Sequence, residues 1–267
     1  MKIRSPFILL ILLTLESHGA YSFTGPAISE NFNGIPTTTV TNVFSNTAGT
    51  QTVISGTSTG FSGAKLAGTS SGSPGSSFIV DNGVGTSGAI YSYGATSGAD
   101  RALGTVASGT NVMGFGFEIV NSSPTLIITE ITASFTQENW RSSTVTTNTF
   151  AASYTTGAAA STTYLTATTG FTAAGALSLI GPTFGSSNGA LDGNLAANQT
   201  ARTLTITGLS IAPAASFYLR WQDVNDAGND AALAIDDLII SFVTIPEPNI
   251  AALLSGLGVI SLLRRRR

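Results

Sequence analysis

Short runs of alternating apolar and polar residues recur along the middle of the chain. In the clearest run, residues 127–135, an apolar set of side chains alternates with a polar set: Ile127, Ile131, Ala133 and Phe135 against Glu130, Thr132 and Ser134. Successive side chains of a β-strand point to opposite faces, so this pattern predicts a strand with one buried face. The sequence predicts further strands over residues 112–120, 149–154, 203–207 (with Leu204 and Ile206 inward), 216–221 and 233–242.

Gly, Pro, Asn and Asp separate these runs and mark the turns between them. Many short strands at this spacing predict an all-β fold, either a β-sandwich or a jelly roll. The stretch from Val40 to Gly63 is less clear, because pairs of apolar residues stand in a background of Thr, Ser and Gly. It is either a set of solvated strands or a low-complexity region, and the pairing of its apolar residues favours strands.

The last 23 residues, 245–267, have a different pattern. Pro246-Glu247-Pro248 is followed by an apolar run of 14 residues, 250–263, and then by Arg264, Arg265, Arg266 and Arg267. The two prolines lack backbone N–H groups, so no strand or helix is expected to continue through them. A stable bilayer span needs about 20 apolar residues. The pattern therefore predicts a short hydrophobic helix that marginally spans a membrane, with the arginines on the cytoplasmic side.

These residues resemble the PEP-CTERM sorting signal of exopolysaccharide-producing Gram-negative bacteria. The resemblance rests on Pro246, Glu247 and Pro248, on Gly256 and Gly258 in the apolar run, and on the terminal arginines. It implies export, transient anchoring in the inner membrane, and processing near the Pro-Glu-Pro motif by a membrane-embedded exosortase. An ordinary C-terminal membrane anchor is the alternative, but a plain anchor has no need of the motif.

The N-terminus has the pattern of a secretory signal peptide. Lys2 and Arg4 precede a continuous apolar run, 7–13, and small residues follow, with cleavage expected near Ala20. The chain therefore divides into a signal peptide (1–20), a Ser-, Thr- and Gly-rich β-sandwich domain (21–244) and the sorting segment (245–267).

Composition restricts the chemistry of the middle domain. The chain has no cysteine, and its one histidine, His18, lies in the signal peptide. A Ser-His-Asp triad, a Cys-His dyad and a zinc site with His or Cys ligands are therefore excluded from the exported domain. Residues 21–244 carry five positive and twelve negative side chains, a net charge of about −7. With no basic patch, nucleic-acid binding is not expected.

Two further stretches resemble an exported β-sandwich domain of secreted bacterial proteins, itself similar to concanavalin-like jelly rolls. The first comprises residues 135–141, with Glu138-Asn-Trp-Arg141, and residues 150–154. The second comprises residues 191–194, 219–230 and 233–238, with Arg220-Trp-Gln-Asp223 and Ile235-Asp-Asp237. The resemblance covers about residues 110–243 and implies a sandwich without an agreed activity of its own.

An acidic loop is the candidate metal site. Asp223, Asn225, Asp226 and Asp230 offer the hard oxygen ligands that Ca²⁺ prefers. Counting from Asp223, Asn225 and Gly228 fit the EF-type loop, whereas Ala227 and Ala234 stand where acidic or amide ligands belong. Two interpretations stay open: a structural calcium site, or a hairpin loop capped by its own Asp and Asn side chains with Arg220 paired to one acid.

Glu138, Trp140 and Arg141 are a candidate sugar site, because Trp stacks on sugar rings and carboxylates catalyse glycoside hydrolysis. The favoured alternative is a Glu–Arg pair beside a core tryptophan. The sequence thus predicts an exported cell-surface or extracellular-matrix protein with a structural or adhesive role linked to exopolysaccharide or biofilm. A carbohydrate- or calcium-binding module, or a carboxylate-based carbohydrate-active enzyme, are the alternatives.

Overall fold

The computed structural model describes residues 19–247, except for residues 26, 59, 69–74, 110, 144–147, 159–160, 162, 183–188 and 227. Residues 1–18 of the predicted signal peptide and Pro248 to Arg267 of the predicted sorting segment lie outside the described residues. The described part is all-β, as the alternating pattern predicts, and its strands form two sheets.

The first sheet has eight strands in the described residues, in the order β11-β10-β14-β8-β4-β3, with β1 paired to β8 and β12 paired to β10. Its strands are β1 (Ala20–Phe23), β3 (Gln51–Val53), β4 (Ser62–Ala67), β8 (Val112–Asn121), β10 (Thr149–Ala158), β11 (Thr172–Ala173), β12 (Leu179–Ile180) and β14 (Ala215–Gln222). Its long strands pair antiparallel, whereas β1 runs parallel to β8.

The second sheet has seven strands in the described residues, in the order β13-β9-β15-β7-β6-β5, with β2 paired to β15. Its strands are β2 (Ile28–Glu30), β5 (Phe78–Asp81), β6 (Ala89–Tyr93), β7 (Ala102–Val106), β9 (Leu126–Arg141), β13 (Gln199–Ile206) and β15 (Ala232–Pro246). Two 3₁₀ turns, η1 (Gly175–Leu177) and η2 (Ala196–Asn198), complete the described elements.

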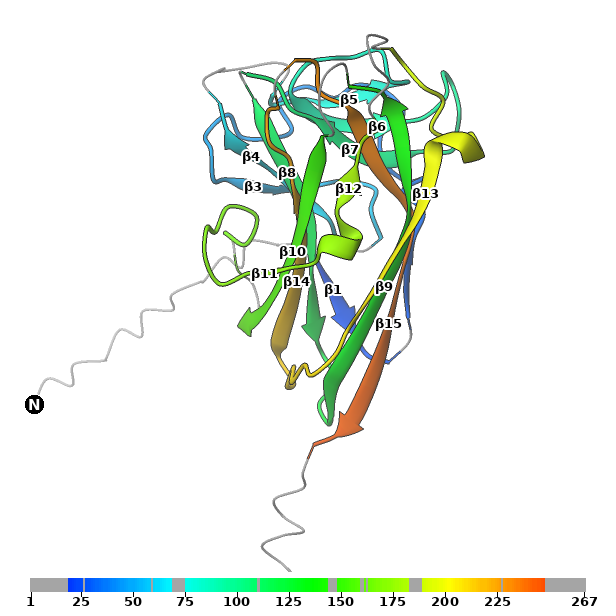
Figure 1. Cartoon of the computed structure of the whole chain (residues 1–267). Helices are drawn as coiled ribbons and strands as arrows, with labels where there is room; N and C mark the ends of the chain where they lie inside the picture. Colours follow the sequence, from blue (N-terminus) through cyan, green and yellow to red (C-terminus); the bar gives the residue numbers. More distant parts are fainter. Residues whose placement is uncertain are drawn as a thin grey trace, which may run out of the picture.

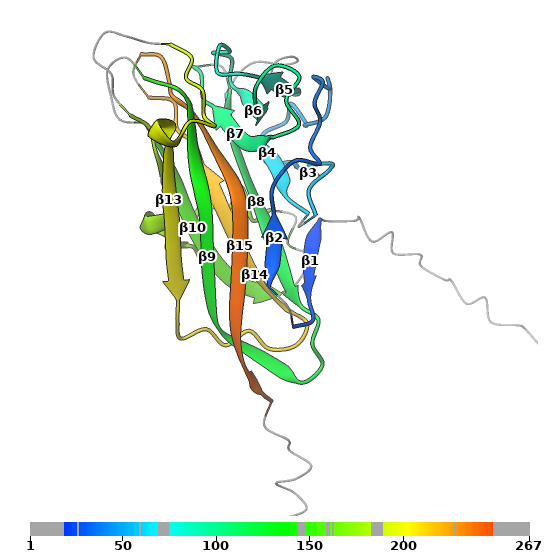
Figure 2. The same cartoon turned by 90° about the vertical axis from the view of Figure 1, so that its right-hand side faces the viewer.

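The two sheets face each other and enclose the main hydrophobic core (Figures 1 and 2). Trp221 of β14 lies at its centre, 5.6 Å from the ring of Phe115 in the same sheet and 5.6 Å from the ring of Phe135 in the opposite sheet. Aromatic rings bury large apolar areas, so these contacts across the layers hold the sandwich together. Among the predicted inward residues, Ile131, Ala133, Phe135 and Ile206 are buried, and Leu204 packs against the core.

Ile127 departs from the predicted face. It is only half-buried, whereas its neighbour Ile128 is fully buried. The reason is a shift of register between β9 and β15, where Val243 pairs with Glu130 but Thr244 pairs with Ile128. A β-bulge inserts one residue on one strand and so exchanges the two faces beyond it.

The stretch from Val40 to Gly63 is mostly irregular, contrary to the prediction of several strands. It contains β3 and the beginning of β4, and Val40 makes an isolated bridge to Phe78. Three of its apolar residues are nevertheless buried in the main core: Phe44, Ile54 and Phe61. Thr, Ser and Gly supply loops here, and the aromatic side chains fasten these loops to the sheets.

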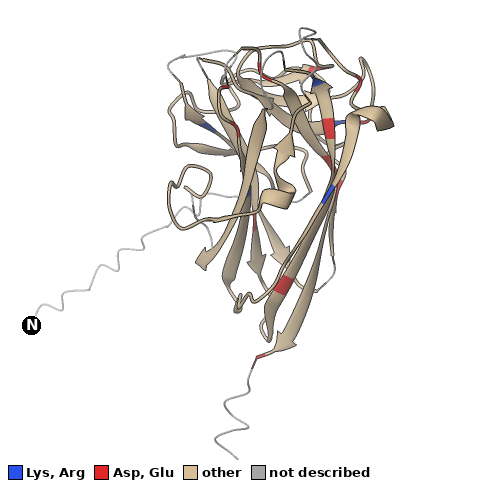
Figure 3. Cartoon of the chain, in the orientation of Figure 1, with Lys and Arg blue, Asp and Glu red and all other residues tan. Residues whose placement is uncertain are grey.

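Charged residues are sparse, and most lie toward the end of the sandwich that carries β5, β6 and β7 (Figure 3). In the part of the chain that the structure describes, no helix is long and apolar enough to cross a membrane.

Candidate functional site

The acidic loop connects β14 to β15. Its first residue, Asp223, is buried: the Oδ2 atom accepts a hydrogen bond from Thr105 Oγ1 at 3.1 Å, and Oδ1 accepts one from the Val224 N–H at 2.8 Å. Burial raises the pKa of Asp223 well above its ordinary value, and the nearby carboxylate of Asp230 raises it further. The carboxyl of Asp223 thus belongs to the inner end of the loop.

Asn148, which precedes β10, joins the other two acids. Its Nδ2 atom donates to Asp226 Oδ2 at 2.7 Å and to Asp230 Oδ1 at 3.2 Å, and its Oδ1 accepts from the Ala231 N–H at 2.6 Å. Asn148 is fully buried, so a polar side chain 78 residues away in sequence from Asp226 holds the loop. No local sequence motif marks this residue as part of the site.

The predicted calcium ligands are therefore only partly brought together. Asp226 and Asp230 share Asn148, Asp223 binds Thr105, and Asn225 is exposed. Across the described ranges, no three or more Asp, Glu, His or Cys side chains are grouped so that they could hold a metal ion. Burial, with help from Asp226, raises the pKa of Asp230 to about 6.

The predicted pairing of Arg220 with an acid of this loop is wrong. Its Nη1 atom donates to the carbonyl oxygens of Tyr164 and Ala167, both at 2.7 Å, and its Nε donates to Ser153 Oγ at 3.0 Å. The guanidinium also lies 3.6 Å from the ring centre of Phe171, a cation–π distance. Arg220 therefore fastens the segment before β11 to the sheet.

The second candidate site contains Glu138 and Trp140, which are neighbours on one face of β9. Both are buried, and the indole Nε1 of Trp140 donates to Glu138 Oε2 at 2.9 Å. Gln199 of β13 donates to the other carboxyl oxygen at 3.2 Å. Burial raises the pKa of Glu138 to about 7, although these two hydrogen bonds lower it.

Trp140 is part of a second apolar cluster, separate from the main core, with Tyr91, Tyr93 and small residues of β7 and β15. The rings of Tyr91 and Tyr93 stack at 5.0 Å, and those of Tyr93 and Trp140 at 5.8 Å. Gly193 lies against the indole so closely that a Cβ there would be 2.4 Å from the ring. The indole is covered, and its flat face is not open to a sugar.

Arg141 does not pair with Glu138 as the sequence analysis favoured. Its Nη1 atom donates to the carbonyl oxygens of Gly83 and Val84, each at 3.2 Å. The electrostatic neighbours of Glu138 are acids instead. Burial raises the pKa of Asp236 on β15 to about 8, and Glu138 is among the charges that raise it further. This face of the sheet therefore carries two buried carboxyl groups, those of Glu138 and Asp236, in place of the expected ion pair between Glu138 and Arg141.

The two ends of the described chain bear on the predicted targeting segments. Ala20, near the expected cleavage point, is the first residue of β1 and pairs with Glu118. At the other end, β15 includes Ile245 and Pro246, which pair with Ile127 and Leu126. The sheet thus extends two residues beyond the predicted boundary at 244.

The strand does stop at the motif. Pro246 is the last residue of β15, and the Glu247 N–H donates to the Thr125 carbonyl oxygen at 2.7 Å. Pro248 and the four arginines Arg264, Arg265, Arg266 and Arg267 lie outside the described residues.

The chain matches no protein-family model, and no curated protein is similar enough to count as a relative.

Proposed function

We propose that this chain is an exported β-sandwich protein that is sorted to the cell surface or the extracellular matrix. In this proposal the signal peptide directs export, and the segment after β15 holds the protein in the inner membrane. An exosortase-type enzyme then processes the chain at Pro246-Glu247-Pro248. The role is structural or adhesive, linked to exopolysaccharide or biofilm.

One observation carries the proposal: the last described strand ends inside the sorting motif. All the strands that the structure describes in the two sheets precede Glu247, whose N–H still binds the Thr125 carbonyl oxygen. Cleavage just after the motif would therefore leave each of these described strands in place. The end of β15 also lies at the pole of the sandwich opposite β5, β6 and β7 (Figure 1). A chain tethered at that pole would direct its loop-rich end away from the membrane.

We also propose that the two sheets form a jelly-roll-like sandwich. Strands that are neighbours in the sheets are often distant in sequence, as with β8 between β4 and β14, which is typical of this topology. A structural role is favoured over carbohydrate hydrolysis because Glu138 and Trp140 are buried against each other.

Cell fractionation tests the proposal, and the structure defines the truncation. Removing residues 248–267 leaves β15 whole, whereas removing 245–267 would delete Ile245 and Pro246 from the sheet. We expect the shorter deletion to release the protein into the medium. The Glu247→Ala variant should still be exported but should keep its C-terminal segment, which mass spectrometry detects. Glu130→Ala, on the same sheet but outside the motif, is the matched control and should be processed normally. A truncated protein that stays in the envelope would refute the sorting proposal.

A further inference from the structure

A polar groove lies at the loop-rich end of the sandwich, between the β5–β6 connection (82–88) and the β6–β7 connection (94–101). It consists of a depression of about 320 Å³ that reaches Arg101 and one of about 220 Å³ that reaches Trp140. Asn82, Ala95 and Thr96 line both depressions, so the two depressions adjoin. Small-molecule sites in proteins have volumes of about 300–1,000 Å³, and the larger depression alone reaches this range.

The walls of the groove are fixed by internal hydrogen bonds. Asp81 Oδ1 accepts from the N–H groups of Gly83 at 2.6 Å and Gly85 at 3.0 Å, which holds the β5–β6 connection. Arg101 donates from Nε to Ser92 Oγ at 2.9 Å and from Nη1 to the Ala95 carbonyl at 3.4 Å, which holds the β6–β7 connection. A preformed site loses little conformational entropy when a ligand binds.

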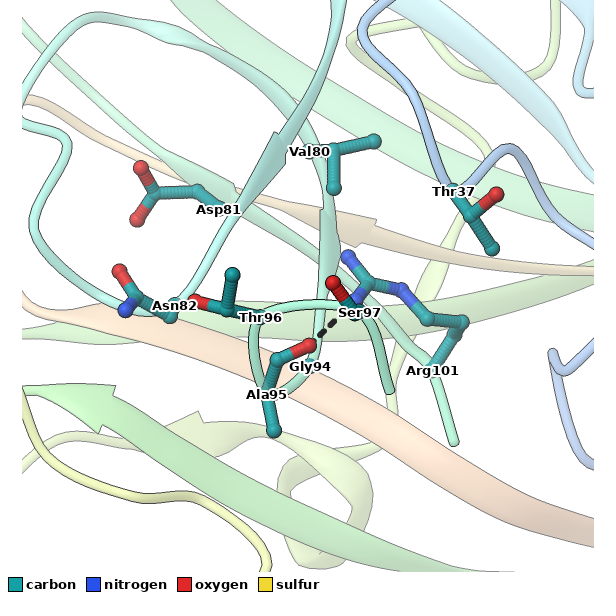
Figure 4. A pocket seen from close by; sticks show the side chains of 9 residues that line it. All are labelled: Thr37, Val80, Asp81, Asn82, Gly94, Ala95, Thr96, Ser97 and Arg101. Atoms are coloured by element: carbon teal, nitrogen blue, oxygen red, sulfur yellow. Dashed lines mark hydrogen bonds between the residues drawn. The ribbon is translucent and has the colours of Figure 1, made fainter. Parts of the chain in front are cut away.

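Short polar side chains, among them Asn82, Thr96 and Ser97, line part of the groove. Figure 4 shows one hydrogen bond among the residues drawn, from Arg101 to Ala95, so Asn82 and Thr96 make none with the others drawn. Both side chains are exposed. An amide and a hydroxyl each donate and accept hydrogen bonds, and this pair stands where the two depressions meet.

The charges in the groove indicate which polar ligand fits. The only positive group lining it, within the described residues, is Arg101, which is buried and donates three hydrogen bonds to Ser92 and Ala95. Asp81 lines one depression and Asp192 the other. Two carboxylates repel an anionic ligand and accept hydrogen bonds from hydroxyl groups. Leu191, which is half-buried, and the buried Trp140 also line the smaller depression.

We propose that this groove binds a neutral polysaccharide, with Asn82 and Thr96 as the central hydrogen-bonding residues. A chain of hydroxyl-rich rings can contact both adjoining depressions, which are lined by amide, hydroxyl and carboxylate groups. The proposal goes beyond sorting and does not depend on it, because the strands β5, β6 and β7, whose connections line the groove, lie at the opposite pole from the end of β15 (Figure 1).

Affinity electrophoresis of the full chain, purified in detergent, tests the site. The probes are three neutral polysaccharides (dextran, laminarin and galactomannan) and one anionic polysaccharide, alginate. We expect at least one neutral probe to retard the protein, and alginate to retard it less. Asn82→Ala should weaken the retardation about tenfold, and Thr96→Trp, which fills the groove, should abolish it. Thr168→Ala, at an exposed threonine away from the groove, is the matched control and should bind as the parent does.

Three results would overturn the proposal: no retardation by any neutral probe, equal retardation of parent and groove variants, or a preference for alginate. Circular dichroism and melting temperature show whether each variant is folded. If Thr96→Trp is unfolded, Asn82→Ala decides the question. Failure of the sorting experiment in cells would leave these results unchanged, so the two proposals are separately testable.

Discussion

Glu138 and Trp140 form a buried hydrogen bond, with the indole N–H donating to the carboxyl group over 2.9 Å. In the sequence these residues suggest a sugar site, because an acid and a tryptophan stand two positions apart. In the structure the indole N–H of Trp140 and the carboxyl group of Glu138 are hydrogen-bonded to each other. The same spacing that would present both to a ligand also allows them to pack together on one face of β9.

The first prediction concerns pH. The pKa of Glu138 is raised to about 7 and that of Asp236 to about 8, mainly by burial. Between about pH 4 and pH 8 the unfolded chain has released protons that the folded chain retains, so stability falls as pH rises. At about 1.36 kcal/mol per pKa unit, we expect the protein to lose up to about 7 kcal/mol of unfolding free energy between pH 4.5 and pH 8.5. Urea unfolding at several pH values measures it.

Glu138→Gln is the diagnostic variant for this effect. It keeps an acceptor for Trp140 but cannot ionise, so the decline toward pH 8.5 should become shallower. The variant should exceed the parent in stability at pH 8.5. A parent protein that gains stability with rising pH would contradict the assignment of buried, protonated carboxyl groups.

The second prediction concerns Asn148. Its removal takes one hydrogen-bond partner from the carboxyl groups of Asp226 and Asp230 and from the N–H of Ala231, while Asp230 Oδ1 keeps the Asp226 N–H. Unsatisfied buried polar groups cost about 1–3 kcal/mol each, so Asn148→Ala should destabilise the protein by roughly 2–4 kcal/mol. The loss should be larger at pH 8 than at pH 5, because the pKa of Asp230 is about 6. Asn194→Ala, at an exposed asparagine, should change stability by less than about 0.5 kcal/mol.

The third prediction concerns calcium. A calcium ion at a hundredfold excess over its Kd would add about 2.7 kcal/mol and raise the melting temperature by roughly 5–10 °C. The carboxyl oxygens of Asp223, Asp226 and Asp230 already accept hydrogen bonds from protein donors. We therefore expect the same melting curve in calcium and in chelator. A calcium-dependent rise that Asp226→Ala abolishes would establish the calcium site instead.

The fourth prediction compares two glycines. Gly83 and Gly49 both have positive φ, +93° and +98°. A Cβ at Gly83 would lie 1.8 Å from the Trp140 carbonyl oxygen, whereas at Gly49 no atom lies within 4 Å. Backbone strain costs an alanine about 1 kcal/mol at either position. Gly83→Ala must also displace backbone, so we expect it to lose about 3 kcal/mol or more.

Chemical denaturation of both glycine variants measures the difference. Equal losses would show that the loop is not packed on Trp140.

The sequence by itself determined the class of the fold. Alternation with period two is a local property, and it marked β9 and the later part of β15, where buried and less buried residues alternate. β8 and β14 are buried on both faces, and their apolar residues marked them instead. The inward positions of Ile131, Ala133, Phe135 and Ile206 followed from the same rule. The absence of cysteine and the position of His18 likewise excluded whole classes of chemistry without any coordinates.

Only the tertiary structure decided which polar side chains meet. The link from Asn148 to Asp226 spans 78 residues, and no local pattern encodes a contact over that distance. The bulges in β9 and β15 turned Ile128 inward in place of Ile127, because register depends on both partner strands. The groove at Asn82 and Thr96 likewise arises where two separate connections meet, and neither segment alone signals it. Alternation reports burial along one strand, whereas a site depends on which strands and loops become neighbours.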